Sequence, residues 1–384
     1  MPKLPSAAPV VAVLWAAVVV TVFWAKMGAE MGQPLPMSVL GASPVACVVR
    51  GLPVVPPSAV NPLAPKQAFA HAPELLLVAP WRGPWERGYL TDWLGVRTRY
   101  ALDCTNDYGY FDFVPSRRLP CIEHDARVAS ATPLLIVDGY MPVVDDEYPE
   151  WIDMIDAAMH AAARARACRD GGPSSRCPAH TFVVLELGAR YGTWGIRALA
   201  FWRALCAPGR ARFVGVDGSE AYVINMHQHA EDNGFESDAF VGIHGFCDAT
   251  FKQQLTPKPP SVPVLGLVET MHLGGVTHID FLDLDIQGSE RDYFQGLRDI
   301  MDRSVAHVHV GTHSTAIHEQ LKRLFADEWG WEPTQDHVFA LRYQACDKTV
   351  VDSLQTDLAL CSEETPRGPV YVRDGLLGFR NPKF

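Results

Sequence analysis

The chain has 384 residues, of which 48% are hydrophobic and 20% charged, and these values are normal for a protein with a globular core. The length suffices for one large or two ordinary domains. The formal net charge of -11 and the lack of any Lys/Arg block argue against nucleic acid as the main partner, since phosphate backbones are held by clustered basic side chains.

The first element is an apolar stretch at the N-terminus. Residues 4–25 carry no charged side chain, and a membrane-spanning helix needs about 20 such residues. A secretory signal has a shorter apolar core and a small-x-small cleavage site, which is missing around Trp24. We therefore expect an uncleaved signal anchor over residues 1–26. It would make the chain a single-pass membrane protein, in type II orientation in the Golgi or endoplasmic reticulum. The alternative is a secreted or organelle-targeted chain after cleavage.

Two regions of different composition follow the anchor. Residues 27–72 are rich in Pro and Ala, which predicts a stalk or linker. Residues 73–180 are predicted to form an irregular N-terminal cap that contains a helix over 149–168, because apolar residues recur there at helical spacing. The nine cysteines fit a lumenal setting, and pairing of Cys104 with Cys121 or of Cys168 with Cys177 would close short loops. Reduced, buried thiols are the alternative.

From residue 181 to the end at 384 the pattern alternates between strand and helix, which predicts one domain with a doubly wound, mostly parallel sheet. The expected strands are 182–187, 212–217, 239–243, 279–286, 305–310, 338–343 and 369–380. Helices are expected over 193–206, 219–232, 262–273, 289–302 and 315–327. Ligands of such sheets bind at the carboxyl ends of the strands, so the residues that follow the strands are the candidates for function.

The first candidate is a glycine loop, Glu186-x-Gly188-x-x-x-Gly192, between the first strand and its helix. Glycines let a backbone approach a ligand closely, and the helix start offers free N–H groups. The G-x-G-x-x-G pattern that holds a dinucleotide pyrophosphate is absent. The looser motif favours a cofactor without phosphates, S-adenosylmethionine, with Glu186 facing its positively charged end. The alternative is a plain strand-to-helix turn whose glycines serve packing.

Two further acids follow the second and third strands. Asp217 ends the second strand 31 positions after Glu186, where a carboxylate can accept hydrogen bonds from both ribose hydroxyls of a nucleoside. Its alternative role is to cap the next helix, although Ser219 could do so equally well. Asp248 follows the third strand, where a carboxylate could accept from the adenine amino group, or could be an ordinary loop acid.

The fourth and fifth strands supply the candidate catalytic residues. Asp285 ends the fourth strand at the ligand-binding edge. His313 follows the fifth, where an imidazole could act as a general base, or could instead cap the next helix or lie exposed at the surface. Asp283 and Asp285 alternate with apolar residues, so both point to one face, and burying two charges there would be costly. His307 and His309 share a face of the fifth strand, but we assign no metal site, since no CxxC pair or similar spacing accompanies them.

The segments Val184–Gly192 and Ile279–Glu290 together resemble the FkbM-type methyltransferases, which carry a "DxGAxxG" loop and, about a hundred residues later, "IDFLKIDVEGAE". The match covers roughly residues 181–330. The resemblance implies a class I, Rossmann-like methyltransferase fold with an antiparallel C-terminal strand, S-adenosylmethionine as donor, and O-methylation of a hydroxyl. Glu186, Gly188, Gly192 and Asp217 would then bind the cofactor. This chain departs from the pattern at Asp283, where the family has Lys, and at Gln287, where it has Glu.

We therefore expect a membrane-anchored methyltransferase that acts on a carbohydrate or small-molecule acceptor, with Asp285 or His313 taking the hydroxyl proton. An anchored glycosyltransferase is the alternative, because Asp283-x-Asp285 fits a metal–nucleotide motif. A non-catalytic domain that kept the fold is the third hypothesis. The sequence predicts neither the acceptor nor the oligomeric state.

Overall fold

The computed structural model describes most of the chain after residue 77. The described residues are 78, 80–104, 118–130, 136–140, 142, 147–170, 181–247, 262–337, 361–365, 368–371 and 375–384. The predicted anchor (1–26), the predicted stalk (27–72) and Asp248 lie outside them. In the described part, no helix combines the length and the apolar character that a membrane span requires.

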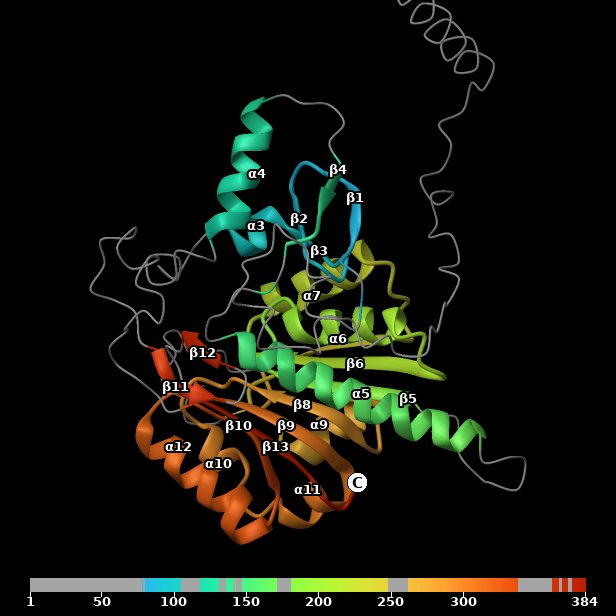
Figure 1. The fold of residues 1–384 in the computed structure, drawn as a ribbon. Helices are drawn as coiled ribbons and strands as arrows, with labels where there is room; N and C mark the ends of the chain where they lie inside the picture. Colours follow the sequence, from blue (N-terminus) through green and yellow to red (C-terminus); the bar gives the residue numbers. More distant parts are fainter. Residues whose placement is uncertain are drawn as a thin grey trace, which may run out of the picture. The chain divides into compact units, whose positions relative to one another are not determined.

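A seven-stranded sheet forms the centre of the fold (Figure 1). Its strands are β5 (Thr181–Leu187), β6 (Arg210–Asp217), β7 (Phe240–His244), β8 (Ile279–Leu284), β9 (Val305–Thr312), β10 (Glu332–His337) and β13 (Gly375–Arg380). They lie in the order β10-β13-β9-β8-β5-β6-β7. Only β13 is antiparallel to its neighbours β9 and β10, while the other pairs are parallel. This topology confirms the predicted class I methyltransferase fold, including its antiparallel last strand.

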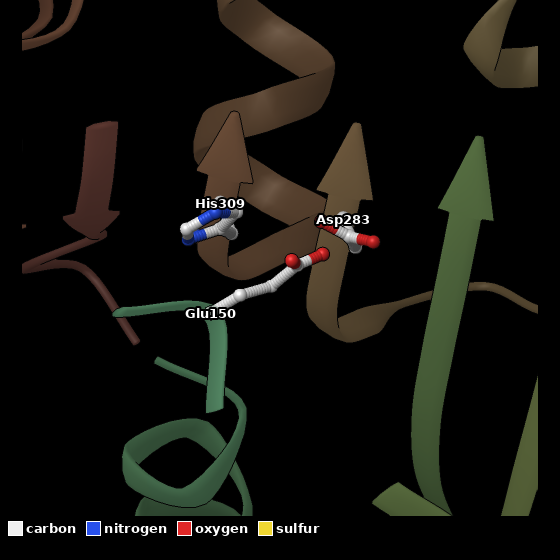
Figure 2. A group of neighbouring side chains, drawn as sticks. All are labelled: Glu150, Asp283 and His309. Carbon is white, nitrogen blue, oxygen red and sulfur yellow. The ribbon is translucent and has the colours of Figure 1, made fainter. Parts of the chain in front are cut away.

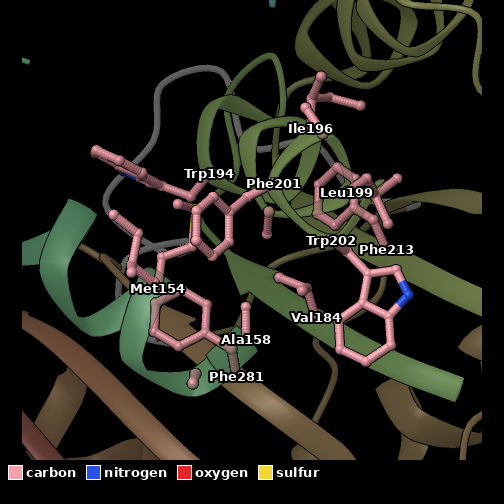
Figure 3. Packing of buried hydrophobic residues seen from close by; sticks show 14 of the residues in the cluster. Met154, Ala158, Val184, Trp194, Ile196, Leu199, Phe201, Trp202, Phe213 and Phe281 are labelled. Carbon is pink, nitrogen blue, oxygen red and sulfur yellow. The ribbon is translucent and has the colours of Figure 1, made fainter. Parts of the chain in front are cut away.

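Helices cover both faces of the sheet. The central strands β5, β8 and β9 are therefore buried on both sides. One face packs against α5 (Tyr148–Asp170), α6 (Thr193–Ala204) and α7 (Glu220–Asp232). The other packs against α9 (Leu267–Gly274), α10 (Glu290–Tyr293), α11 (Arg298–Ser304), α12 (Thr315–Lys322) and the π-helical segment Arg323–Trp329. Figure 3 shows the first core, to which α6 contributes Phe201, α5 contributes Met154 and β8 contributes Phe281.

The region before α5 forms short elements beside α6 and α7. They are β1 (Arg82–Pro84), β2 (Tyr89–Thr91), β3 (Arg97–Arg99), α3 (Tyr100–Asp103), α4 (Arg118–Ser130) and β4 (Ile136–Asp138). A disulfide joins Cys104 to Cys121, one of the pairings that the sequence left open. Arg99 binds Asp232 at the end of α7. A further hairpin, β11 (Cys361–Thr365) with β12 (Gly368–Tyr371), precedes β13.

Most predicted elements of the sheet domain are confirmed, with three differences. The helix expected over 289–302 is two short helices, α10 and α11, separated at Gly296, whose φ of 74° favours glycine. The strand expected over 338–343 falls outside the described residues, whereas β10 lies just before it. The C-terminal segment 369–380 divides into β12 and β13 around the predicted Asp374-Gly375 turn.

Packing of α6 against β6 depends on a glycine. A Cβ on Gly195 would lie 2.2 Å from ring atoms of Phe213, which is fully buried. We expect Gly195→Ala to lower the free energy of unfolding by about 1–3 kcal/mol, the usual cost of overpacking a core. Urea unfolding would measure the change. In the control Gly266→Ala the new Cβ meets nothing closer than 3.5 Å, and we expect a loss below about 1 kcal/mol. Equal losses in both variants would contradict this account.

Candidate functional site at the carboxyl edge of the sheet

The loop after β5 lies directly against the end of β8. The Asp285 N–H donates to the Leu187 carbonyl at 3.0 Å. Gly188 has a φ of 82°, and a Cβ there would stand 2.0 Å from the Asp285 carbonyl oxygen. Only glycine satisfies both the backbone angle and this close approach. Gly188 therefore sets the separation between the two strand ends around which the predicted site residues gather.

The second glycine of the motif serves the start of α6. Gly192 precedes that helix with a φ of 75°, and a Cβ there would lie 2.8 Å from the Phe213 ring. Packing therefore accounts for Gly192, the alternative role that the sequence left open. The loop still presents its backbone at the edge where ligands of open α/β sheets bind.

Glu186 is buried at the end of β5 and accepts from backbone N–H groups of α6. Its carboxylate oxygens lie 2.9 Å from the Gly195 nitrogen and 3.4 Å from that of Trp194. These are N–H groups of the first helical turn, which have no partner within the helix. Burial raises the pKa of Glu186 to about 8, although both N–H groups oppose that rise. Glu186 thus holds the start of α6 to the end of β5. The sequence had suggested that it faces the positively charged end of the cofactor.

Asp217 lies at the end of β6, partly exposed, next to the glycine loop. One carboxylate oxygen accepts from the Arg190 N–H at 2.9 Å and the other from the Ser219 N–H at 2.8 Å. Burial raises the pKa of Asp217 above its ordinary value, and the two N–H groups counteract this. Each oxygen keeps a lone pair. The carboxylate is therefore fixed in place and can still accept from two hydroxyl groups.

The structure brings the two predicted catalytic residues together. His313 Nε2 lies 3.2 Å from Asp285 Oδ1, and His313 Nδ1 lies 2.8 Å from Glu290 Oε1. The Asp285 side chain is 51% exposed and also accepts from the Gln287 amide. Glu290 is fully buried at the start of α10 and accepts from the Gly288 N–H. Glu290 and Gln287 follow Asp285 closely in the chain, and their convergence with it, which the sequence already suggested, is found in the structure.

This arrangement determines the charge of His313. Burial lowers its pKa, but the hydrogen bonds and charges of Asp285 and Glu290 outweigh burial and raise it to about 10. In the same way, burial raises the pKa of Asp285, but His313, the Gln287 amide and the Arg190 charge together lower it by more, so that it falls below its ordinary value. At neutral pH the pair is therefore an imidazolium beside a carboxylate. A protonated imidazole cannot accept a proton, so this charge disfavours His313 as the general base.

Asp283 is not at the edge with Asp285. It lies two residues earlier, inside β8, in register with Glu186 of β5 and His309 of β9. Its exposed fraction is only 2%. The two aspartates share a face of the sheet, as their alternation predicted, but only Asp285 is accessible. A metal–nucleotide motif needs both carboxylates at the ligand, so this burial disfavours Asp283-x-Asp285 as such a motif.

Comparison with known proteins gives limited matches. No family model matches the chain. A protein of Jannaschia sp. (strain CCS1) described as "Putative methyltransferase" is 24% identical over 232 residues, which cover 53% of this chain and 73% of that protein.

Two solved structures share the arrangement only loosely. M. capricolum TrmK, solved in complex with S-adenosyl-homocysteine, is 9% identical, with 59% of this chain and 68% of that one covered and a TM-score of 0.29. The magnesium protoporphyrin IX methyltransferase of Synechocystis PCC 6803, solved with bound SAM, is 11% identical, with 59% and 81% covered and a TM-score of 0.28. The strand order described above therefore carries the fold assignment.

The charge of His313 predicts a pH-dependent stability. Because its folded pKa exceeds the unfolded value, the His313 contribution is complete below about pH 6.5 and is lost as the pH rises toward 10. Between pH 6.5 and 9.5 the wild type should lose about 1.5–3 kcal/mol relative to His313→Gln, the range for hydrogen bonds to charged groups. Urea unfolding at several pH values would measure the difference.

The control for this experiment is His307→Gln. Burial, followed by His160, lowers the pKa of His307 to about 3, so that this imidazole stays neutral over the same pH range. Its removal should leave the pH slope of the wild type unchanged. Parallel curves for the wild type and His313→Gln would show that His313 carries no extra proton.

Proposed function

We propose that the chain is an S-adenosylmethionine-dependent methyltransferase. The observation that carries the proposal is the placement of Asp217 at the end of β6, fixed by two N–H groups, beside the glycine loop of a sheet with class I strand order. The similarity to the Jannaschia protein and the FkbM-like segments Val184–Gly192 and Ile279–Glu290 support the same activity.

The residues of the edge fit this cofactor in their chemistry. Asp217 would accept from the ribose hydroxyls, since both of its oxygens retain a lone pair. The loop backbone at Gly188 and Gly192 would lie along the cofactor, while Glu186 holds that loop to α6. Bound there, the cofactor supplies an electrophilic methyl group on a sulfonium.

Asp285 would act on the acceptor. Its carboxylate stays ionised at neutral pH and is half exposed, so it can accept a hydrogen bond from an incoming hydroxyl. His313 is a positioning residue that holds the Asp285 carboxylate from one side and is itself held by Glu290. Orientation of the hydroxyl, more than strong base catalysis, would then supply the rate enhancement.

The narrower parts of the proposal rest on the sequence. We infer O-methylation of a carbohydrate or small natural product from the FkbM-like motifs. We infer attachment to a membrane from the uncharged residues 4–25. The exposed Asp285 supports a hydroxyl acceptor, because an ionised carboxylate accepts the hydrogen bond that a hydroxyl donates.

Calorimetry on the purified full-length chain tests the donor. We expect saturable binding of S-adenosylmethionine and no heat from a UDP-sugar with manganese beyond that of manganese alone. Binding of the UDP-sugar without S-adenosylmethionine would replace this proposal by the glycosyltransferase alternative. Binding of neither ligand would favour a non-catalytic domain.

A matched pair of variants tests the role of Asp217. We expect Asp217→Asn to weaken S-adenosylmethionine binding by about 1–3 kcal/mol, the value of lost hydrogen bonds. Asp238→Asn is the control, because Asp238 precedes β7 at the opposite edge of the sheet and is exposed beside Arg210. Unchanged affinity in Asp217→Asn would remove Asp217 from the cofactor site.

A further inference from the structure

Below the carboxyl edge, three side chains from α5, β8 and β9 converge in the buried interior (Figure 2). They are Glu150, Asp283 and His309, with exposures of 9%, 2% and 1%. Each offers one ligand atom, and these atoms lie within 4.8 Å of one another. Ligand atoms at about 2.0–2.2 Å from one ion lie no more than about 4.4 Å apart. A small contraction would therefore bring all three onto a common ion.

His309 is oriented by a second carboxylate from α5. Its Nδ1 lies 2.7 Å from Asp153 Oδ2, and Asp153 Oδ1 accepts from the Thr334 hydroxyl at 2.8 Å. A carboxylate at Nδ1 fixes the tautomer in which Nδ1 carries the proton and Nε2 keeps its lone pair. Histidines that bind metals have this support in nearly all sites, because it fixes the ring and makes the ligating nitrogen more basic.

Two buried polar atoms of this cluster lack a hydrogen-bond partner among the described residues: His309 Nε2 and Asp283 Oδ1. Leaving such atoms unpaired costs roughly 1–3 kcal/mol each. The charged neighbours that act most on Glu150 are themselves carboxylates, namely Asp283, Glu147 and Asp285. The Glu150 and Asp283 carboxyl groups hydrogen-bond to each other, but no basic side chain among the described residues forms an ion pair with either of them.

A second cluster at the carboxyl edge, Asp285, Glu290 and His313, also consists of two acids and one histidine, but its histidine has no free nitrogen. There both ring nitrogens of His313 already contact carboxylates. An imidazolium has no lone pair for a metal. His309 differs because one of its nitrogens is free.

We propose that Glu150, Asp283 and His309 bind one divalent first-row transition-metal ion, such as Zn²⁺ or Mn²⁺. Two carboxylates and one neutral imidazole are suited to such ions and not to soft ones. Two negative ligands balance the charge of the ion, which offsets the cost of burying two neighbouring carboxyl groups. That cost is visible at Glu150, whose pKa is raised by burial and by the charge of Asp283. The ion links α5 to β8 and β9 and so stabilises the packing of that helix on the sheet. This inference is independent of the methyl donor.

Metal content tests the proposal directly. The full-length chain, purified without chelator and also refolded with Zn²⁺ or Mn²⁺, should contain about one equivalent by mass spectrometry of the elements. His309→Gln and Asp283→Asn should each lower this content at least tenfold. Adding the metal should also raise the midpoint of thermal unfolding of the chelator-treated wild type, by about 5 °C for tight binding, but not that of the variants.

Two further variants locate the ion. His307→Gln removes a buried imidazole on the same face of β9, which lies against His160, and should retain the metal. His313→Gln should also retain it. Circular dichroism of each variant separates loss of metal from loss of fold. A wild type with less than a tenth of an equivalent after both preparations would overturn the proposal. So would a metal that His313→Gln loses and His309→Gln keeps.

Discussion

The close contact between the loop after β5 and the end of β8 positions the rest of the candidate site. Gly188 has no side chain, so the Asp285 backbone can approach it, and the Asp285 N–H reaches Leu187. Any Cβ at Gly188 would push the two strand ends apart. The Asp285 side chain leaves from this same point toward His313. The loop continues to Arg190, whose N–H holds Asp217 on the other side. This one backbone contact thus sets the spacing between Asp217, which we propose binds the methyl donor, and Asp285, which we propose binds the methyl acceptor.

The polar groups of the fold lie in two levels on one face of the sheet. In the upper level Asp285 is accessible, and the His313 imidazolium lies between its carboxylate and that of the buried Glu290. The lower level, with Asp283 and His309, is buried and carries acceptors without a matching positive charge. Because α5 covers this face and contributes Glu150, the packing of that helix and the charge of the lower level depend on each other. A bound cation would stabilise both together.

Sequence periodicity predicted the central strands well, because apolar residues dominate β5 and recur between the polar residues of β8 and β9. It missed β10, whose sequence from Glu332 to His337 is polar and carries a proline, and which pairs as the outermost strand of the sheet. Asp285 and His313 were found because each follows a strand at the carboxyl edge. The contact between Asp285 and His313 depends on side-chain packing that no spacing encodes, whereas Glu290 lies only a few residues after Asp285 and was expected to converge with it. Glu150 and Asp153 were missed for the same reason, since they come from a helix that the sequence placed in the cap.

The glycine loop needs a different interpretation from the one its sequence suggested. Gly188 is required by the Asp285 carbonyl and Gly192 by Phe213, so both would be needed in a protein that binds nothing. Glu186 is likewise occupied by the first turn of α6. None of these three residues by itself distinguishes a cofactor site from a well-packed turn. Asp217 does distinguish the two, because it lies at the strand end where a nucleoside ligand of this fold would bind. Its two N–H partners hold the carboxylate in place, and each oxygen can still accept a further hydrogen bond. The sheet order and Asp217 therefore indicate a methyl donor more strongly than the glycines that first suggested it.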